Sequence, residues 1–248
     1  MRVLCACIIA GLSLGAFAQD DGVEAKIKEA MAADIRTEAE VARDRNRKPV
    51  ETLAFFQFSD DLRVLELLPG GGWYTKLLAP VLRENGELYV SIGTNNVQQN
   101  LIPQPGFDHV NVLNIGVESE SIGPFGTSYV GPFDFGVSDI DLAVTFRNMH
   151  GFTPEGRANM NAAVFAALKS GGLYGVIDHS RRHMQQIDSE SRRRVDVVQI
   201  IKEVLAAGFE LVDYSDLHYR PDDELRYEVG RATVTGNTDR FTLLFQKP

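Results

Sequence analysis

The chain has 248 residues, of which 34 are acidic and 25 are basic, so its net charge at pH 7 is −9. A negatively charged protein is repelled by nucleic-acid phosphates, which argues against a nucleic acid as substrate or partner. This length is enough for one sizeable hydrophobic core, and no internal repeat or low-complexity tract suggests a second globular domain.

Residues 1–18 differ in composition from the rest of the chain. Arg2 is the only charged residue before Asp20, the positions between them are apolar or small, and residues 16–18 read Ala-Phe-Ala. These features are typical of a secretory signal peptide that is cleaved after Ala18. We therefore expect a mature domain of residues 19–248 that is periplasmic or secreted. The segment is shorter than the roughly 20 apolar residues that span a bilayer, so we expect no stable membrane insertion after cleavage.

Both cysteines, Cys5 and Cys7, lie in this segment. The mature chain would therefore have no disulfide, no cysteine metal site and no thiol nucleophile. The histidines follow neither the H-x-x-x-H nor the H-E-x-x-H spacing, so the sequence predicts no metal site.

Two helices are expected ahead of the first strand. Residues 22–42 carry apolar side chains at helical spacing, and Pro49 fits the first turn of a second helix. Both helices should pack across the sheet edge near the ligand cleft. The charged segment 44–48 between them is expected to be a solvated link, with ligand binding by Arg47 as the alternative.

The most informative stretch is a strand, a glycine turn and a helix in direct succession. Residues 64–68 form a short apolar run, Pro69-Gly70-Gly71-Gly72 ends it, and apolar residues then recur at helical spacing from Tyr74. This order is the first half of a βαβ unit, in which a ligand can approach the glycine backbone and the free N–H groups of the helix. The spacing is not the G-x-G-x-x-G of dinucleotide-binding proteins.

This stretch resembles the first motif of class I S-adenosylmethionine (SAM)-dependent methyltransferases, where a strand ends in an acidic residue and a glycine-rich turn wraps the methionine part of SAM. The resemblance implies that Glu66 is the acidic residue and that Trp73 or Tyr74 lies near the adenosyl or sulfonium group. The alternative for Trp73 is a plain position in the hydrophobic core. The turn itself would consist of Pro69, Gly70, Gly71 and Gly72.

The sequence departs from this family pattern at two positions. Leu68 stands where the family has another glycine. The second strand, residues 87–92, ends without the carboxylate that holds the ribose hydroxyls in the family. Ser91 or Asn95 could form hydrogen bonds there, although more weakly than a charged partner.

The remaining elements complete an alternating pattern. Strands are expected at 109–115, 141–146, 173–177, 209–214 and 241–245, with helices from Thr153 and over 192–207, and residues 96–134 are expected to be mostly a long loop over the pocket. The run Arg192-Arg193-Arg194 is expected to be a solvated helix start. The pattern predicts an α/β fold with a Rossmann-like doubly wound, mostly parallel seven-stranded sheet of the class I methyltransferase type and N-terminal helices.

Polar residues follow the fourth and fifth strands of this predicted sheet. Asn148 and His150 follow the fourth strand, and Asp178 and His179 close the fifth. In the methyltransferase topology these strands are neighbours, and ligands bind beyond their carboxyl ends. We expect Asn148 to orient donor or acceptor and one of the two histidines to act as the base, with Asp178 fixing a ring tautomer. The alternatives are a helix-capping role for His150 and a structural hydrogen-bond network at Asp178 and His179.

A wider resemblance covers almost the whole mature chain. The four segments Pro-Gly-Gly-Gly-Trp-Tyr-Thr, Thr-Phe-Arg-Asn-Met-His, Val-Ile-Asp-His and Thr-Asp-Arg-Phe together are similar to those of a group of bacterial predicted methyltransferases with signal peptides. This resemblance implies SAM as cofactor, contact of Arg147 with it, and an exported enzyme that methylates a small molecule. An exported binding protein that kept the pocket without the chemistry is the alternative, favoured by Leu68 and the missing carboxylate. A nucleotide-dependent enzyme is a weaker third hypothesis, and the sequence specifies neither the acceptor nor the oligomeric state.

Overall fold

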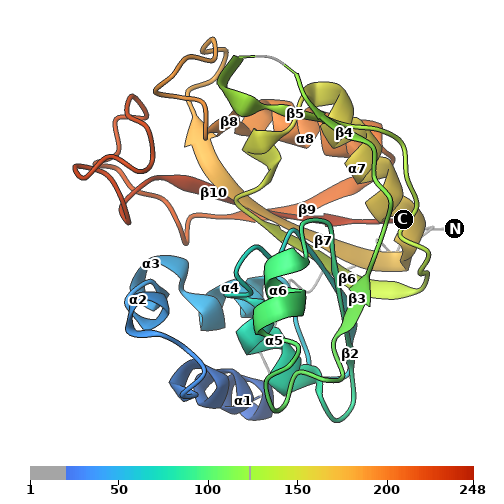
Figure 1. The fold of residues 1–248 in the computed structure, drawn as a ribbon. Coiled ribbons are helices and arrows are strands. Elements are labelled where there is room, and N and C mark those ends of the chain that lie inside the picture. The colour runs from blue at the N-terminus through green and yellow to red at the C-terminus, as the bar shows by residue number, and fades with distance from the viewer. Residues whose placement is uncertain (1–20, 123) are drawn as a thin grey trace, which may run out of the picture.

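A computed structural model describes residues 21–122 and 124–248. The expected signal peptide and its cleavage site lie outside the described residues. Figure 1 shows a twisted central sheet with helices on both of its faces. Among the described residues, no helix is both long and apolar enough to cross a membrane.

The main sheet has the strand order β3-β2-β1-β6-β7-β10-β9, and β8 pairs with the end of β7. All neighbours are parallel except β10, which is antiparallel to both β7 and β9. The predicted doubly wound, mostly parallel sheet is therefore confirmed, and β8 is an additional short strand. The strands are β1 (Arg63–Leu67), β2 (Glu87–Ser91), β3 (Asn111–Leu113), β6 (Ile140–Phe146), β7 (Leu168–Arg181), β8 (Val195–Asp196), β9 (Glu210–Ser215) and β10 (Arg240–Gln246).

Alternation along the strands builds one core on each face of the sheet. In β1, Val64 belongs to the core under the N-terminal helices, whereas Leu65 and Leu67 belong to the opposite core. Glu66 follows the side of Val64 and is a buried carboxylate in an apolar layer. One face carries α1 (Asp21–Ala32), α4 (Pro49–Phe55), α5 (Thr75–Leu82) and α6 (Asn95–Asn100), and the other carries α7 (Pro154–Ala167) and α8 (Val197–Ala206) (Figure 1).

The N-terminal region is not the single helix predicted for residues 22–42. After α1 the chain turns and forms two short helices, α2 (Glu38–Val41) and α3 (Asp44–Arg47). Thr37 begins α2 with a capping box: its side chain accepts a hydrogen bond from the Glu40 backbone, and the Glu40 carboxylate accepts one from the Thr37 backbone. These local bonds satisfy the free N–H groups of a new helix start, so they favour a break at this position.

The segment before α8 also differs from the prediction. The helix begins at Val197, where Asp196 caps it by accepting from the Val198 N–H at 2.9 Å. Arg194 lies ahead of the helix and is only 1% exposed. Its guanidinium donates to both carboxylate oxygens of Asp223 at 2.8 and 3.1 Å. The prediction of a solvated position was wrong for Arg194, because a distant carboxylate supplies the counter-charge that permits its burial.

The segment 96–134 contains more structure than the expected loop. Besides α6 and β3 it has a hairpin of β4 (Ser119–Ser121) and β5 (Ser128–Val130), which is separate from the main sheet. Asn159 of α7 donates to the Val130 carbonyl at 2.8 Å, and the Thr153 N–H donates to the Ser128 carbonyl at 3.0 Å. These bonds hold the hairpin against the start of α7.

Candidate functional site

A cavity of about 270 Å³ lies at the carboxyl ends of β1 and β6, above the glycine turn. We call it the turn cavity. Most of the residues predicted to contact a cofactor line it. Three residues of the N-terminal segment line it too, and of these the sequence analysis considered only Arg47, as an alternative. Its lining consists of Glu40, Arg43, Arg47, Glu66, Leu68, Pro69, Gly70, Gly71, Trp73, Tyr74, Phe146, Arg147 and Asn148.

The three glycines of the turn have two structural roles. A Cβ added at Gly70 or Gly71 would meet no atom within 4 Å, so the backbone there is open to a ligand. Gly72 has a φ of +78°, and a Cβ on it would lie 2.9 Å from the Leu101 side chain. Gly72 does not line the cavity; it lets the turn pack against α6.

Leu68 has a backbone conformation that glycine adopts more readily than leucine. Its φ is +52°, in the left-handed region that favours glycine. Its side chain packs against the core on the α7 side of the sheet, and its N–H donates to the Ser91 carbonyl at 2.8 Å. The turn cavity is therefore open beside Leu68.

Glu66 is the buried carboxyl group of this cavity. It is 2% exposed, and the Thr75 hydroxyl donates to its Oε2 at 2.6 Å. Burial raises the pKa of Glu66 to about 7, and the hydrogen bond and the Arg47 charge offset only part of that rise. A cationic group arriving in the cavity would favour the ionised carboxylate, so the site is suited to an ammonium or a sulfonium.

We expect Glu66→Gln to stabilise the protein at alkaline pH. Because the pKa of this carboxyl is about 7 when folded and near 4.5 when unfolded, the folded chain keeps a proton that the unfolded chain loses between these pH values. The free energy of unfolding of the parent chain therefore falls across this window, by about 3 kcal/mol from this group. Chemical denaturation at pH 4 and pH 8 measures it: the variant should gain stability over the parent only at pH 8. An equal difference at both pH values would contradict the assignment.

Aromatic rings form one wall of the turn cavity. Tyr74 stacks on Phe146 with ring centroids 3.5 Å apart and an interplanar angle of 10°, and Trp73 meets the edge of this pair. The Arg47 guanidinium lies 4.2 Å above the Trp73 ring, and that of Arg36 lies 5.0 Å from it. Both arginines make cation–π contacts with the Trp73 ring, and both Trp73 and Tyr74 line the cavity.

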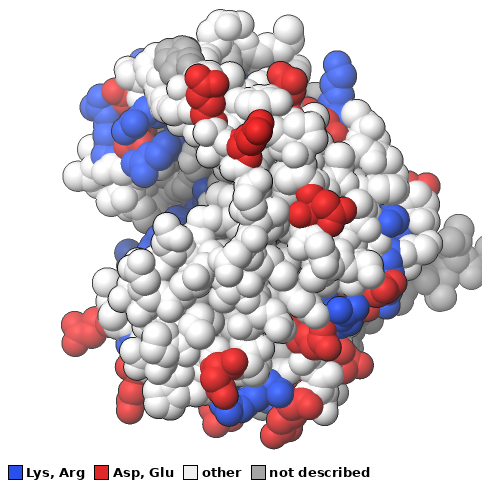
Figure 2. Space-filling model, turned by 45° about the vertical axis from the view of Figure 1, so that its right-hand side comes forward, with Lys and Arg blue, Asp and Glu red and all other residues white. Residues whose placement is uncertain are grey.

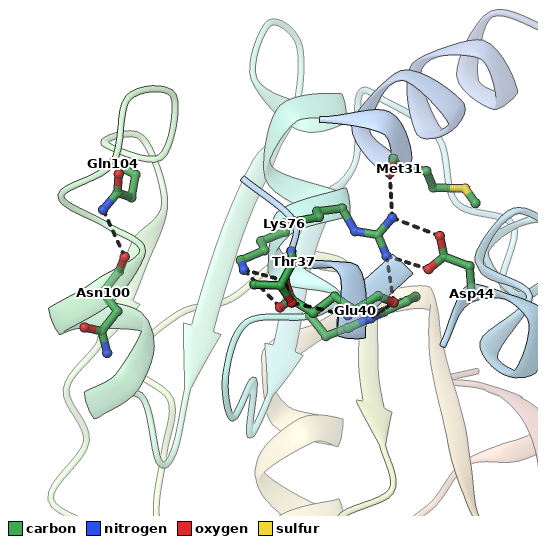
Figure 3. A network of polar contacts seen from close by, with 9 residues as sticks. Met31, Thr37, Glu40, Asp44, Lys76, Asn100 and Gln104 are labelled. Atoms are coloured by element: carbon green, nitrogen blue, oxygen red, sulfur yellow. Dashed lines mark hydrogen bonds and ion pairs between the residues drawn. The ribbon is translucent and has the colours of Figure 1, made fainter. Parts of the chain in front are cut away.

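A network of hydrogen bonds and ion pairs holds the N-terminal helices next to the cavity (Figure 3). Glu40 of α2 binds Lys76 of α5 at 2.9 Å, and its carbonyl accepts from the Trp73 indole at 3.1 Å. Arg36 joins the end of α1 to the start of α3 by donating to the Met31 carbonyl at 2.7 Å and to Asp44 at 2.9 Å. The predicted solvated link 44–48 is therefore a short packed helix, and its Arg47 is buried at 6% exposure. The expectation of a solvated Arg47 was wrong because this network draws α3 against the aromatic wall.

The end of β6 is tied directly to the glycine turn. The Asn148 amide donates to the Leu67 and Leu68 carbonyls at 3.4 Å each and to the Thr145 hydroxyl at 3.2 Å. Arg147 has a φ of +64°, and its N–H donates to the Ile177 carbonyl at 2.6 Å. This bend carries the Arg147 side chain into the turn cavity.

The two predicted histidines meet at one carboxylate. Asp178 is fully buried and accepts from the His150 ring Nδ1 at 2.7 Å, from the His150 backbone at 2.9 Å and from the His179 backbone at 2.7 Å. The rings lie 6.2 Å apart between centroids, yet they line different hollows: His150 faces one with Arg157 and Arg181, outside the turn cavity. Burial, together with nearby arginines, lowers the pKa of His179 well below 6.5, so its ring is neutral at physiological pH.

His179 lines a second hollow of about 450 Å³, which we call the arginine groove. The groove shares Arg43, Arg47 and Arg147 with the turn cavity. Its other lining residues are Ala42, Arg45, Asn46, Arg193, Val229, Gly230, Thr235, Gly236, Thr238 and Arg240. In Figure 2, basic side chains show in the hollow on the left of the molecule, while both basic and acidic side chains are scattered over the rest of that face.

Sequence reasoning missed most of these arginines. Arg43, Arg45 and Arg47 alternate along one short segment, which was a visible signal of a basic surface. In the sequence, Arg240 was noted only as part of the motif Thr-Asp-Arg-Phe. Its position in the groove depends on the pairing of β10 with β7, which places Arg240 opposite His179. No local pattern predicts that the two chain ends meet at one groove.

Ser91, the expected ribose contact, is fully buried, and its hydroxyl has no hydrogen-bond partner among the described residues. It does not line the turn cavity, so its contact with a ribose stays a prediction. The part of the chain that the structure describes holds no group of three or more histidine, cysteine or acidic residues arranged for a metal ion.

Comparisons with known proteins give a match in structure alone. Neither protein-family models nor curated proteins match the sequence. A SAM-dependent methyltransferase from Aquifex aeolicus has a TM-score of 0.57 at 14% identity, over 91% of this chain and 98% of that one. The CcbJ methyltransferase from Streptomyces caelestis has a TM-score of 0.51 at 12% identity, over 82% and 89%. The [4+2]-cyclase SpnF has a TM-score of 0.55 at 15% identity, over 88% and 85%. The chain therefore has the fold of class I SAM-dependent methyltransferases.

Proposed function

We propose that this protein, which has the class I methyltransferase fold, is an exported SAM-dependent methyltransferase that acts on a small molecule. The turn cavity carries this proposal. It is open at Gly70 and Gly71, contains the buried carboxyl of Glu66, and lies at the carboxyl ends of the parallel strands, where such sheets bind ligands.

The residues of the cavity fit the methionine part of SAM. The backbone of Gly70 and Gly71 leaves room for it, and Glu66 offers a carboxyl group to its cationic end. Arg43 and Arg47 line the same cavity and could pair with its carboxylate. When bound, SAM would supply an electrophilic methyl group on a sulfonium.

The chain itself would align the acceptor and take its proton. Alignment can contribute several kcal/mol to catalysis, with ~7–11 in the best intramolecular models. His179 is neutral, lines the groove next to the turn cavity, and interacts with the Thr238 hydroxyl through Nδ1 at 3.0 Å. We assign His179 as the base for a hydroxyl acceptor. We assign Asp178 as the positioning residue, because its carboxylate binds both the His150 ring and the His179 backbone.

Direct titration of residues 19–248 with SAM and S-adenosylhomocysteine by calorimetry tests the cofactor. We expect micromolar affinity for both compounds. If neither compound gives heat or a thermal shift, the proposed function is wrong.

Sequencing the N-terminus of protein from cells tests export, since a start at Met1 would contradict cleavage after Ala18.

The protonation state of His179 can be measured without knowing the acceptor. Burial and the Arg240 charge lower the pKa of this imidazole, so its NMR signals should stay at the neutral position as the pH falls through 6.5. A His179→Asn variant assigns the signals. A midpoint at or above 6.5 would contradict the lowered pKa of His179 and the burial that causes it.

An exported binding protein without catalysis is the second candidate. Leu68 and the absence of a carboxylate at the end of β2 favour it. The structural likeness to SpnF, which is described as a [4+2]-cyclase, indicates that the fold is compatible with a function other than methyl transfer. Incubation with methyl-labelled SAM and a small-molecule extract separates the two: an enzyme transfers the label, and a binding protein does not.

A further inference from the structure

The arginine groove has a charge that is unusual for this chain. Six arginines line it, and its lining in the described part of the chain includes no aspartate or glutamate. The whole protein, in contrast, has a net charge of −9. So many basic groups around one hollow of an acidic protein need a physical reason.

Other buried arginines of this protein are paired with carboxylates. Arg194 binds Asp223, Arg157 binds Glu203, and Arg36 binds Asp44. These pairs follow the general rule that a buried charge is found with a counter-charge, because an unpaired one costs several kcal/mol in lost hydration.

The buried arginines of the groove break this rule. Arg240 is 7% exposed, donates to the Asn46 carbonyl at 2.9 Å, and keeps a buried Nε without a hydrogen-bond partner among the described residues. Arg47 is 6% exposed, its guanidinium lies over the Trp73 and Tyr74 rings, and it has no ion pair among the described residues. The half-buried Arg147 side chain has no ion pair there either. Among the groove arginines of the described residues, Arg193 has a carboxylate partner, Glu228.

Mutual repulsion adds to the cost of this arrangement. Burial and the Arg147 charge lower the pKa of Arg47 to about 8, and the same two causes lower that of Arg240 to about 10. An anion bound between these side chains would replace their lost hydration and turn repulsion into attraction. Guanidinium groups pair with carboxylate and phosphate oxygens in a bidentate geometry, so both groups suit this site.

We propose that the arginine groove binds the methyl acceptor through an acidic group, a carboxylate or a phosphate, so that the substrate is a small organic acid or phosphoester. The identity of the occupant as acceptor rests on the function proposed above. Arg43, Arg47 and Arg147 line both hollows, so an acid held there lies next to the donor cavity, with His179 in the same groove. Arg45 and Arg240 line the groove and not the turn cavity. Substitutions of these two arginines therefore distinguish binding of the acceptor's acidic group from binding of the SAM carboxylate.

The test is a calorimetric titration with inorganic phosphate and with citrate at constant ionic strength, in the presence of saturating S-adenosylhomocysteine. We expect at least one anion to bind, and the tighter one indicates whether a phosphate or a carboxylate is preferred. Arg240→Gln and Arg45→Gln should each weaken this binding at least fivefold and leave the affinity for S-adenosylhomocysteine within twofold. Arg45 is exposed and unpaired in the described chain, so its variant should fold even if Arg240→Gln does not.

Arg83→Gln is the matched control, because Arg83 is an exposed arginine outside both hollows. Unchanged anion affinity in both groove variants would overturn the proposal, as would the lack of anion binding to the complex with S-adenosylhomocysteine. Anion binding that disappears when S-adenosylhomocysteine is bound would assign the arginines to the cofactor instead. A protein that binds phosphate or citrate but never S-adenosylhomocysteine would defeat the proposed methyl transfer, and the acceptor assignment with it, while leaving an anion site.

Discussion

Gly71→Val should weaken the binding of S-adenosylhomocysteine at least a thousandfold, which corresponds to about 4 kcal/mol. A Cβ at Gly71 meets no protein atom within 4 Å, and its φ is not left-handed, so the folded chain accepts a side chain there. That side chain would instead fill the space that the turn leaves for a ligand. Calorimetry on the parent and the variant measures the loss.

Gly116→Val is the matched control for this experiment. Gly116 is also open around its Cβ position, but it is exposed in a loop and does not line the turn cavity. Its variant should bind like the parent chain, and thermal unfolding of all three proteins should agree closely. If Gly71→Val binds as tightly as the parent, the cofactor does not lie against this turn.

Asp223→Ala should lower the free energy of unfolding by about 3–5 kcal/mol, because it leaves the Arg194 charge buried and unpaired. Both side chains of this pair are fully buried. Asp223 also accepts hydrogen bonds from the Leu225 and Asp239 backbones at 3.0 and 2.7 Å, so it shapes the segment that leads into β10. Urea denaturation of the parent and the variant measures the difference.

Glu224→Ala tests whether burial causes this effect. Glu224 is the next residue, and its contact with Arg226 at 3.5 Å is exposed on both sides. Exposed ion pairs contribute at most about 1 kcal/mol, so this variant should stay within that range of the parent. A small loss in Asp223→Ala, comparable to that of the control, would show that water or another carboxylate replaces the partner of Arg194.

The candidate site is built from segments that are far apart in the sequence. The helix α3 and the residue before it contribute Arg43, Arg45 and Arg47. The turn after β1 contributes the glycines, and the start of β10 contributes Arg240. Figure 1 shows the N-terminal helices and the loop before β10 facing each other on the same side of the sheet. Substitutions at either end of the chain should therefore affect the same groove.

Local sequence patterns predicted seven strands of the main sheet and missed only the short β8. Alternating apolar runs, the glycine turn at Gly70 and the strand ends at Asn148 and Asp178 predicted a doubly wound sheet, because strand and helix periodicities are set by neighbours in the chain. The same patterns placed Glu66, Arg147 and Asn148 near one edge of the sheet, where the turn cavity lies.

Tertiary structure alone decided the charge balance of the site. Whether an arginine is buried with a partner, like Arg194, or without one, like Arg240, depends on residues that are distant in sequence. The separation of His150 from His179 has the same cause, since the hollow that each ring faces is formed by other strands and loops. Backbone periodicity is a local property of the chain, whereas burial and electrostatic pairing arise only when remote segments exclude water together.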